Sequence, residues 1–264
     1  MEAPQLLQRY THVLQRLQKA CDAAGRRRSE VTLIAVSKLH SARAVACCAN
    51  AGQVDFGENY VQEALIKRDI LESFPCIKSD IDRIRWHMIG HVQSRKARLV
   101  VGAFCLVHTL DSRKLADAME RRARELDTLQ PVLFEVNVGE EIQKSGVLPC
   151  DLPKLADYVL EHCPHLEVRG LMCLPPVFDA GDAARPHFSR LRGLRDALQQ
   201  HCGLPLRELS MGMSGDFAGA VAEGATMVRI GTDIFGPRCI EDQKLEQDTC
   251  SNLTGMTSVN ANDG

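Results

Sequence analysis

The sequence has no surplus of basic residues and few aromatic side chains. Its 264 residues carry 32 lysines and arginines against 34 aspartates and glutamates, a net charge of −2, and 5% are aromatic. Binding to a nucleic-acid backbone calls for a basic surface, so we expect no nucleic-acid partner. The uncharged apolar stretches have the length of β-strands, far short of the about 20 residues that a membrane span requires. We therefore expect a soluble globular protein with no membrane partner.

The sequence also lacks a cysteine framework, although it contains 11 cysteines. No C-x-x-C occurs, and the closest pair is the adjacent Cys47 and Cys48. Others, such as Cys105 and Cys173, lie within apolar runs, where a cysteine usually acts as a small buried hydrophobic residue. Zinc sites need thiolates or histidines at tight spacing. We predict neither a metal site nor a disulfide framework.

No hydrophobic signal core follows Met1, which favours a cytoplasmic protein. The apolar residues of the first segment fall on one helical face: Leu6, Tyr10, Val13, Leu14, Leu17 and Cys21. This segment has arginines and few acidic residues, so a mitochondrial presequence stays open. We favour the alternative, an extra helix packed on the domain.

Short apolar runs alternate with helical patterns along most of the chain. The first run, 31–38 (VTLIAVSK), is apolar almost throughout, as in a parallel strand buried on both faces. Ser41 then opens a helix that ends near Gly52. The later strand candidates are 53–59, 84–90, 104–110, 131–139, 168–174, 207–213 and 227–231. The helical stretches between them include 112–127, 151–163 and 184–202.

These eight strand and helix units predict the overall architecture. Eight β/α units within about 210 residues are typical of an α/β fold of the (β/α)8 TIM-barrel type, here with an extra N-terminal helix. The alternative is a doubly wound open sheet, which would require a glycine fingerprint after an early strand; the sequence has none. We predict a barrel domain over 1–238 and a polar, disordered tail over 239–264.

The C-terminal end of the first strand carries Lys38. Functional groups of such barrels lie at this end of the strands. An ammonium group at the end of an apolar strand is partly desolvated, which lowers its pKa and suits it to form a Schiff base with an aldehyde or ketone. For this residue alone, a lysine that extends its charged group into water is an equally good interpretation.

The last two strands are followed by loops of small residues, 210–221 (SMGMSGDFAGAV) and 229–236 (RIGTDIFG). Barrels frequently bind phosphate in these two loops. Glycines let the backbone approach a ligand closely, while hydroxyl groups and the Arg229 guanidinium add donors. Because strand one pairs with strand eight in a closed barrel, Lys38 and Arg229 should be neighbours. A phosphate-bearing aldehyde fits this set, and pyridoxal phosphate is the common example.

Six motifs carry a resemblance to a known family: AVSK (35–38), FGENYVQE (56–63), WHMIGHVQSRK (86–96), GLM (170–172), LSMGMSGDFAGAV (209–221) and VRIGTDIFG (228–236). Together they resemble the pyridoxal phosphate homeostasis proteins, the single-domain relatives of the alanine racemase barrel. The resemblance extends from about Val31 to Arg238 and covers all eight units. Family members often have a second lysine and a proline after the AVSK lysine; this sequence has Leu39, His40 and Ser41 there.

The resemblance implies a set of cofactor-binding residues. Lys38 would hold pyridoxal phosphate as a Schiff base, and Arg229 would contact the pyridine nitrogen, which weakens the ring as an electron sink. The phosphate would be held by the last two strand loops: Ser210, Met211, Ser214, Gly231 and Thr232. Asn59 could reach the ring or cap the following helix. His87 could stack near the ring or form hydrogen bonds within the barrel.

The resemblance further implies a protein that buffers and delivers pyridoxal phosphate in vitamin B6 homeostasis, with no established catalytic reaction. The residues after about Arg238 are too few for the second domain with which the racemase relatives complete their sites. We therefore expect a monomeric carrier, not an enzyme, whose protein partners are apo-enzymes that accept the cofactor. Two alternatives stay open: a low-activity racemase or lyase that uses Lys38 as a base, and a Schiff-base barrel for sugar phosphates that needs no cofactor.

Overall fold

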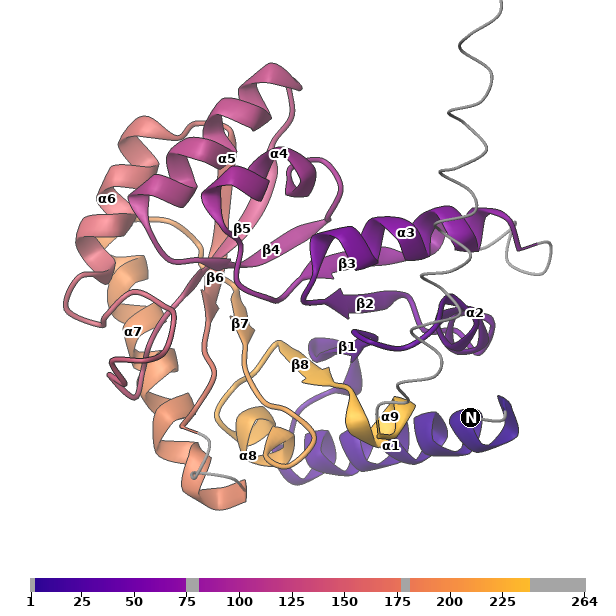
Figure 1. The fold of residues 1–264 in the computed structure, drawn as a ribbon. Helices are drawn as coiled ribbons and strands as arrows, with labels where there is room; N and C mark the ends of the chain where they lie inside the picture. The colour runs from indigo at the N-terminus through magenta and orange to yellow at the C-terminus, as the bar shows by residue number, and fades with distance from the viewer. Residues whose placement is uncertain (1–2, 75–80, 177–180, 238–264) are drawn as a thin grey trace, which may run out of the picture.

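Eight parallel strands pair in sequence order and close into a barrel (Figure 1). The computed structural model describes residues 3–74, 81–176 and 181–237. The strands are β1 (Thr32–Val36), β2 (Asp55–Glu58), β3 (Arg85–Met88), β4 (Leu106–Leu110), β5 (Gln130–Glu135), β6 (Leu166–Met172), β7 (Glu208–Ser210) and β8 (Met227–Ile230). Each lies within or next to one of the eight predicted runs. The predicted TIM-type barrel is confirmed, and the open sheet is excluded.

The barrel closes where β1 pairs with β8, and the register aligns Ile34 with Arg229. Five buried apolar residues from five strands form a small cluster inside the barrel: Ile34, Leu106, Leu133, Met172 and Met227. Successive strand residues alternate between the two faces, so residues two positions further along a strand also face the axis. On three of these strands the next inward residue is polar: His108, Glu135 and Arg229. The barrel interior therefore changes from apolar to polar toward its C-terminal mouth.

Helices cover the outside of the barrel: α2 (Ala42–Asn50), α3 (Val61–Glu72), α4 (Ala97–Val100), α5 (Arg113–Glu125), α6 (Leu152–His162), α7 (Arg185–Cys202), α8 (Phe217–Ala222) and α9 (Thr232–Phe235). Short 3-10 helices occupy Arg28–Glu30, Ile81–Arg83, Ser94–Lys96 and Gly181–Ala184. The Ser41 hydroxyl caps α2 by accepting a hydrogen bond from the Ala44 amide at 3.3 Å. Helix α7 ends at Gly203, whose φ of 68° is left-handed, as is common at the C-terminal end of a helix.

The predicted extra helix, α1 (Ala3–Ala23), lies along the outside of the barrel beside α2, α8 and α9 (Figure 1). Its inner face is buried through five residues at helical spacing: Leu6, Tyr10, Val13, Leu17 and Cys21. These side chains belong to the main hydrophobic core between the strands and the helices. The structure thus has the packed helix that the apolar stripe predicts.

The sequence also predicts that a membrane span, a metal site and a disulfide framework are absent, and the described residues contain none of these features. Among the described residues, no helix is long and apolar enough to cross a membrane. In the same part of the chain, no group of three or more histidine, cysteine or acidic side chains could hold a metal ion, and the cysteines are free thiols. The predicted tail, 239–264, lies outside the described residues.

Candidate functional site

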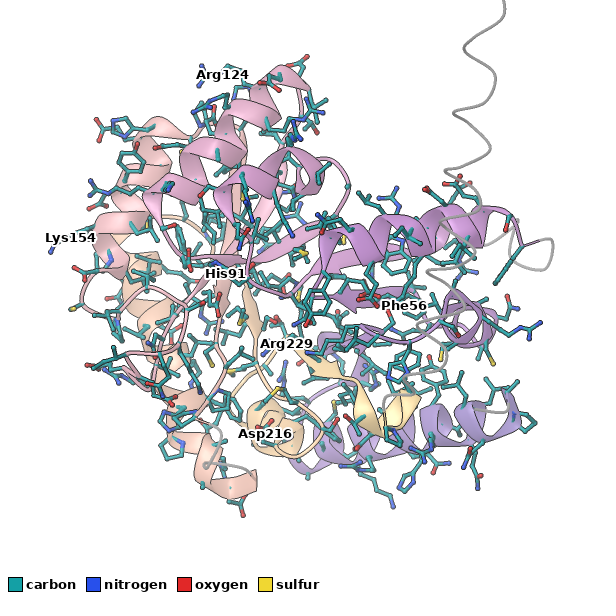
Figure 2. The ribbon with its side chains drawn as sticks, in the orientation of Figure 1. Phe56, His91, Arg124, Lys154, Asp216 and Arg229 are labelled. Carbon is teal, nitrogen blue, oxygen red and sulfur yellow. The ribbon has the colours of Figure 1, made fainter. Side chains whose placement is uncertain are left out.

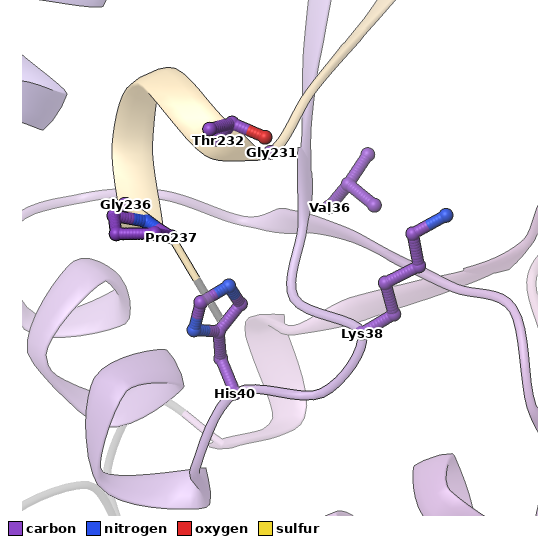
Figure 3. Close-up of a pocket in the computed structure, with 7 residues that line it drawn as sticks. All are labelled: Val36, Lys38, His40, Gly231, Thr232, Gly236 and Pro237. Atoms are coloured by element: carbon purple, nitrogen blue, oxygen red, sulfur yellow. The ribbon is translucent and has the colours of Figure 1, made fainter. Parts of the chain in front are cut away.

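A pocket at the mouth of the barrel is lined by the segments that follow the first and last strands (Figure 3). Its volume is about 270 Å³, near the lower limit of about 300 Å³ for small-molecule pockets. Lys38 and His40 line it from the segment after β1, and Gly231 and Thr232 line it from the end of β8. The side chains of Val36 and Pro237 and the backbone of Gly236 complete the wall. The structure therefore places Lys38 and the loop after the eighth strand around the same pocket.

The backbone on both sides of Lys38 is anchored. Before it, the Ser37 carbonyl oxygen accepts a hydrogen bond from the Lys67 ammonium at 2.6 Å. After it, the Leu39 amide donates to the Glu63 carboxylate, and Leu39 has a left-handed φ of 60°. This conformation is uncommon for a residue with a side chain and is held here by surrounding bonds. The position of the Lys38 Cα is therefore fixed, while its side chain is half-buried at the pocket.

These anchors belong to a buried charged cluster that the sequence analysis missed. Lys67, only 1% exposed, places its ammonium 2.7 Å from Glu58 and 2.6 Å from Glu63. The Ser37 hydroxyl donates to the same Glu58 oxygen, Oε1, at 2.7 Å, whereas Oε2 has no partner. Burial raises the pKa of Glu58 to about 7, and Lys67 acts in the opposite direction. Both glutamates come from the FGENYVQE motif, and the four-residue spacing of Glu63 and Lys67 on a helix was the available signal.

The loop after β7 is bonded to strand β8. The Arg229 amide donates to the Gly212 carbonyl oxygen at 2.9 Å, and the amide of buried Met211 donates to the Met227 carbonyl oxygen at 3.1 Å. Gly212 has a φ of 95°, and a Cβ there would lie 2.6 Å from the Ala220 Cβ. Beyond this frame lie two residues with hydroxyl groups: Ser214 is half-buried and Thr232 is exposed.

Ser210 and Arg229 lie deeper, inside the barrel. Both are buried, and Arg229 is labelled within the ring of strands in Figure 2. Arg229 donates from Nη1 to the Ser210 hydroxyl oxygen at 2.6 Å and from Nη2 to the Cys173 carbonyl oxygen at 2.9 Å. A guanidinium has five N–H donors, and these bonds use two of them. The structure thus places Ser210 next to Arg229, one layer below Ser214 and Thr232.

A chain of hydrogen bonds continues from Ser210 across the barrel. The Ser210 hydroxyl lies 2.8 Å from His108 Nδ1, and His108 Nε2 lies 3.0 Å from His87 Nδ1. His87 Nε2 is 2.9 Å from Asp55, which also accepts two bonds from Arg85 at 2.7 Å. His87 therefore has both ring nitrogens bonded to protein groups, deep in the barrel.

The direction of these bonds follows from charge. Complete burial holds the pKa of His108 well below its usual value, so this ring is neutral and has one N–H. Because Ser210 accepts from Arg229, its hydroxyl hydrogen is available to His108 Nδ1. His108 then donates to His87, and His87 donates to Asp55. Each hydrogen bond in this series is donated in the direction from Arg229 to Asp55. The series therefore holds the Arg229 side chain in one position.

Asn59 lies at the end of β2, where β3 approaches closely. A Cβ on Gly90 would lie 2.4 Å from the Asn59 carbonyl oxygen, so only glycine fits there. The Asn59 side chain is half-buried, and its buried Oδ1 has no hydrogen-bond partner. The residue at the N-cap of α3 is Tyr60, which makes no capping bond from its side chain. Asn59 thus provides an unsatisfied acceptor near the mouth.

Glu135 is a second site residue that the sequence analysis missed. It ends β5, two positions after the inward Leu133, and is 6% exposed. Burial and the nearby Asp111 raise its pKa to about 7, while Arg229 acts in the opposite direction. Its Oε2 has no hydrogen-bond partner. The signal in the sequence was a glutamate at the end of the apolar run PVLFE (131–135).

The donor set of this mouth suits an aldehyde that carries a phosphate. Lys38 supplies an amine for the aldehyde, and Ser214 and Thr232 supply hydroxyl donors for an anion. Arg229 supplies a buried cation, and its pKa is lowered by burial. Asn59 and Glu135 each leave one buried oxygen without a partner, so the mouth has unsatisfied acceptors as well.

Comparisons with known proteins identify the relatives of this chain. The model of the family "Alanine racemase, N-terminal domain" matches residues 7–239. A pyridoxal phosphate homeostasis protein of Aquifex aeolicus is 43% identical over 231 residues, which cover 88% of this chain and 97% of that protein. PipY of Synechococcus elongatus, solved with PLP bound, is 39% identical with a TM-score of 0.70, covering 78% of this chain and 93% of PipY.

The barrel is also shared with a larger enzyme. An alanine racemase of Corynebacterium glutamicum aligns with a TM-score of 0.65 at 20% identity, covering 88% of this chain and 62% of the racemase chain. At this identity the likeness shows the fold alone.

Proposed function

This chain belongs to the pyridoxal phosphate homeostasis protein family, and from this premise we propose that it binds pyridoxal phosphate at the barrel mouth. In this proposal the protein buffers the cofactor and delivers it to apo-enzymes. The related PipY, with PLP bound, supports the choice of ligand. We also propose a cytoplasmic location, which the free thiols of the described cysteines support.

One observation carries the proposal: Lys38 and Thr232 line the same pocket. In the proposed complex Lys38 would hold the cofactor, and its amine would condense with the aldehyde to give a Schiff base and water. The hydroxyl groups of Ser214 and Thr232, with the Gly231 backbone, would bind the phosphate. Ser210 and Met211, which lie deeper, would hold this loop in place. When bound, pyridoxal phosphate supplies a reactive aldehyde and an electron-withdrawing ring.

The buried series of hydrogen bonds from Arg229 to Asp55 supports a cofactor carrier more than a catalyst. Arg229 is buried below the barrel mouth and fixed through Ser210, and the resemblance implies that it contacts the pyridine nitrogen. A guanidinium cannot give up its proton in a protein, so it disfavours a second positive charge on the ring nitrogen. An unprotonated ring accepts electrons poorly, which removes much of the driving force for reactions of amino acids.

The proposal is tested by reduction with borohydride, which fixes a Schiff base as a stable amine. Incubation of the protein with pyridoxal phosphate and borohydride should label the peptide that contains Lys38. Lys38→Ala should lose the label and the visible absorbance. Lys154→Ala, a control at an exposed lysine, should keep both. A label on another peptide, or full absorbance in Lys38→Ala, would refute the assignment.

Delivery requires a second experiment. Addition of a cofactor-free acceptor enzyme to the loaded protein should restore the activity of that enzyme while the absorbance of the barrel falls. Acceptor activity that rises no faster than with the same amount of free pyridoxal phosphate would argue against delivery by this protein.

Glu135 favours a second candidate function, a low-activity racemase or lyase acting on amino acids. Its buried carboxyl group has a pKa of about 7, so it could exchange a proton near neutral pH. This candidate predicts turnover of at least one amino acid that falls in both Lys38→Ala and Glu135→Gln. A panel of amino acids incubated with the loaded protein distinguishes the two functions, since a carrier should turn over none of them.

A further inference from the structure

A single arginine on α1 contacts both loops of the proposed phosphate site. Arg16 forms an ion pair with Asp233, the residue after Thr232. It also donates from Nη2 to the Ser214 carbonyl oxygen at 3.2 Å. Its guanidinium carbon lies 4.9 Å from the centre of the Phe217 ring, at the start of α8. Segments 198 and 217 residues away from Arg16 in the chain are thus joined by one side chain.

Asp233, the ion-pair partner of Arg16, is an acidic residue in the loop proposed to bind the phosphate. Its carboxylate lies one residue from Thr232, which we propose as a phosphate ligand. A carboxylate in this loop would repel a phosphate dianion bound by the same loop, because like charges interact through space near a protein surface. The Arg16 guanidinium neutralises that carboxylate from outside the barrel.

The packing of α1 shows that Arg16 is not required to attach the helix. Five buried side chains of α1 contribute to the main core, and Leu17 and Cys21 are completely buried. The side chain of Arg16 is 40% exposed, so its contribution to stability through an ion pair is small. A role in the ligand site explains its contacts better than a role in folding.

We propose that Arg16 is a positioning residue of the phosphate site. It cancels the charge of Asp233 and holds the β7 and β8 loops in the arrangement that accepts a phosphate. This inference rests on the proposed function. It makes α1, which lies outside the barrel, a part of the ligand site.

Two variants test this inference: Arg16→Gln and the double variant Arg16→Gln with Asp233→Asn. Arg16→Gln should weaken pyridoxal phosphate about tenfold, as expected for one unneutralised charge near the phosphate. Its affinity for pyridoxal, which has no phosphate, should stay unchanged. The double variant should regain most of the lost affinity, because the repelling carboxylate is gone. Arg9→Gln removes the same charge from the same helix and should leave both affinities unchanged.

Several results would overturn the inference. These are an equal loss for pyridoxal phosphate and pyridoxal, no loss in Arg16→Gln, or no recovery in the double variant. Inorganic phosphate gives a readout that does not depend on Lys38: it should raise the melting temperature of the unaltered protein more than that of Arg16→Gln. If that difference is present but borohydride labels no Lys38 peptide, the proposed attachment at Lys38 fails, while the role of Arg16 at a phosphate site stands. If the label is present and the difference is absent, the reverse holds.

Discussion

Replacement of Lys67 by methionine tests the buried cluster that anchors the Lys38 segment. Methionine has a similar length and no charge. The change leaves the Glu58 and Glu63 carboxylates without their shared ammonium, and the Ser37 carbonyl oxygen loses its donor. Loss of one partner of a buried ion pair costs about 3–5 kcal/mol, because the remaining charge stays in a medium of low polarity.

That cost should be visible in thermal unfolding. For a domain of this size, 1 kcal/mol corresponds to about 2–4 °C in melting temperature, so Lys67→Met should melt about 10 °C lower. The pKa of Glu58, already about 7, should rise further without the ammonium. Lys67→Met should therefore recover part of its stability as the pH falls from 8 to 6. The displaced Lys38 segment should also slow borohydride labelling at neutral pH.

Two further variants make the test specific. In Lys67→Met combined with Glu58→Gln, the most buried carboxylate is neutral, so the double variant should be more stable than Lys67→Met alone. Lys154→Met removes a lysine that is 73% exposed and lies at the outer edge of the molecule (Figure 2), and it should change stability by less than about 0.5 kcal/mol. A Lys67→Met protein as stable as Lys154→Met, or a double variant less stable than Lys67→Met, would refute the reasoning.

Two predictions concern the ligand and the acid–base properties of the barrel. Pyridoxal should bind at least about a hundredfold more weakly than pyridoxal phosphate, a difference of about 2.7 kcal/mol. The reason is that charge-assisted bonds to the phosphate contribute about 1.5–3 kcal/mol each. Equal affinities of the two compounds in a titration would contradict a phosphate site in the loops after β7 and β8. Glu135→Gln should gain stability relative to the unaltered protein as the pH rises from 4.5 to 8. The pKa of about 7 means that the folded protein keeps a proton which the unfolded chain has released, and this advantage of about 3 kcal/mol is lost as the pH passes 7. A difference in urea unfolding that does not vary with pH would contradict the second prediction.

The order of elements could be predicted from the sequence because each strand of this barrel is a short apolar run next to a helix signal. The run 31–38 contains β1, and five of the six residues predicted to share one face of the first helix are buried, while Leu14 is half-buried. The pairing of the first and last strands followed from closure alone. These features depend on local composition and on topology, which a sequence reports directly.

The interior of the barrel could not be predicted in the same way. A strand buried on both faces shows no alternation of polar and apolar residues, so the sequence does not say which side chains face the axis. His108 and Glu135 lie in such runs, and the β4–β5 and β5–β6 pairs contain register shifts. The contacts from Arg229 to Asp55 join five strands and depend on those registers. Arg16 and Asp233 are 217 residues apart, so their ion pair could not be predicted from local spacing.

The contrast between the two lysines of the site explains how this barrel could both hold and release a cofactor. Lys67 is buried among carboxylates and fixes the backbone around Lys38, whereas the Lys38 side chain is half-buried at a pocket open to exposed Thr232. A rigid backbone lowers the entropy cost of forming the Schiff base. An open pocket lets water or the lysine of an acceptor reach the same carbon, so the linkage can be reversed. In the proposed complex, binding of the phosphate by Ser214 and Thr232 would then determine how long the cofactor stays. Changes at Arg16 should therefore alter the release rate, while changes at Lys67 should alter the rate at which the linkage forms.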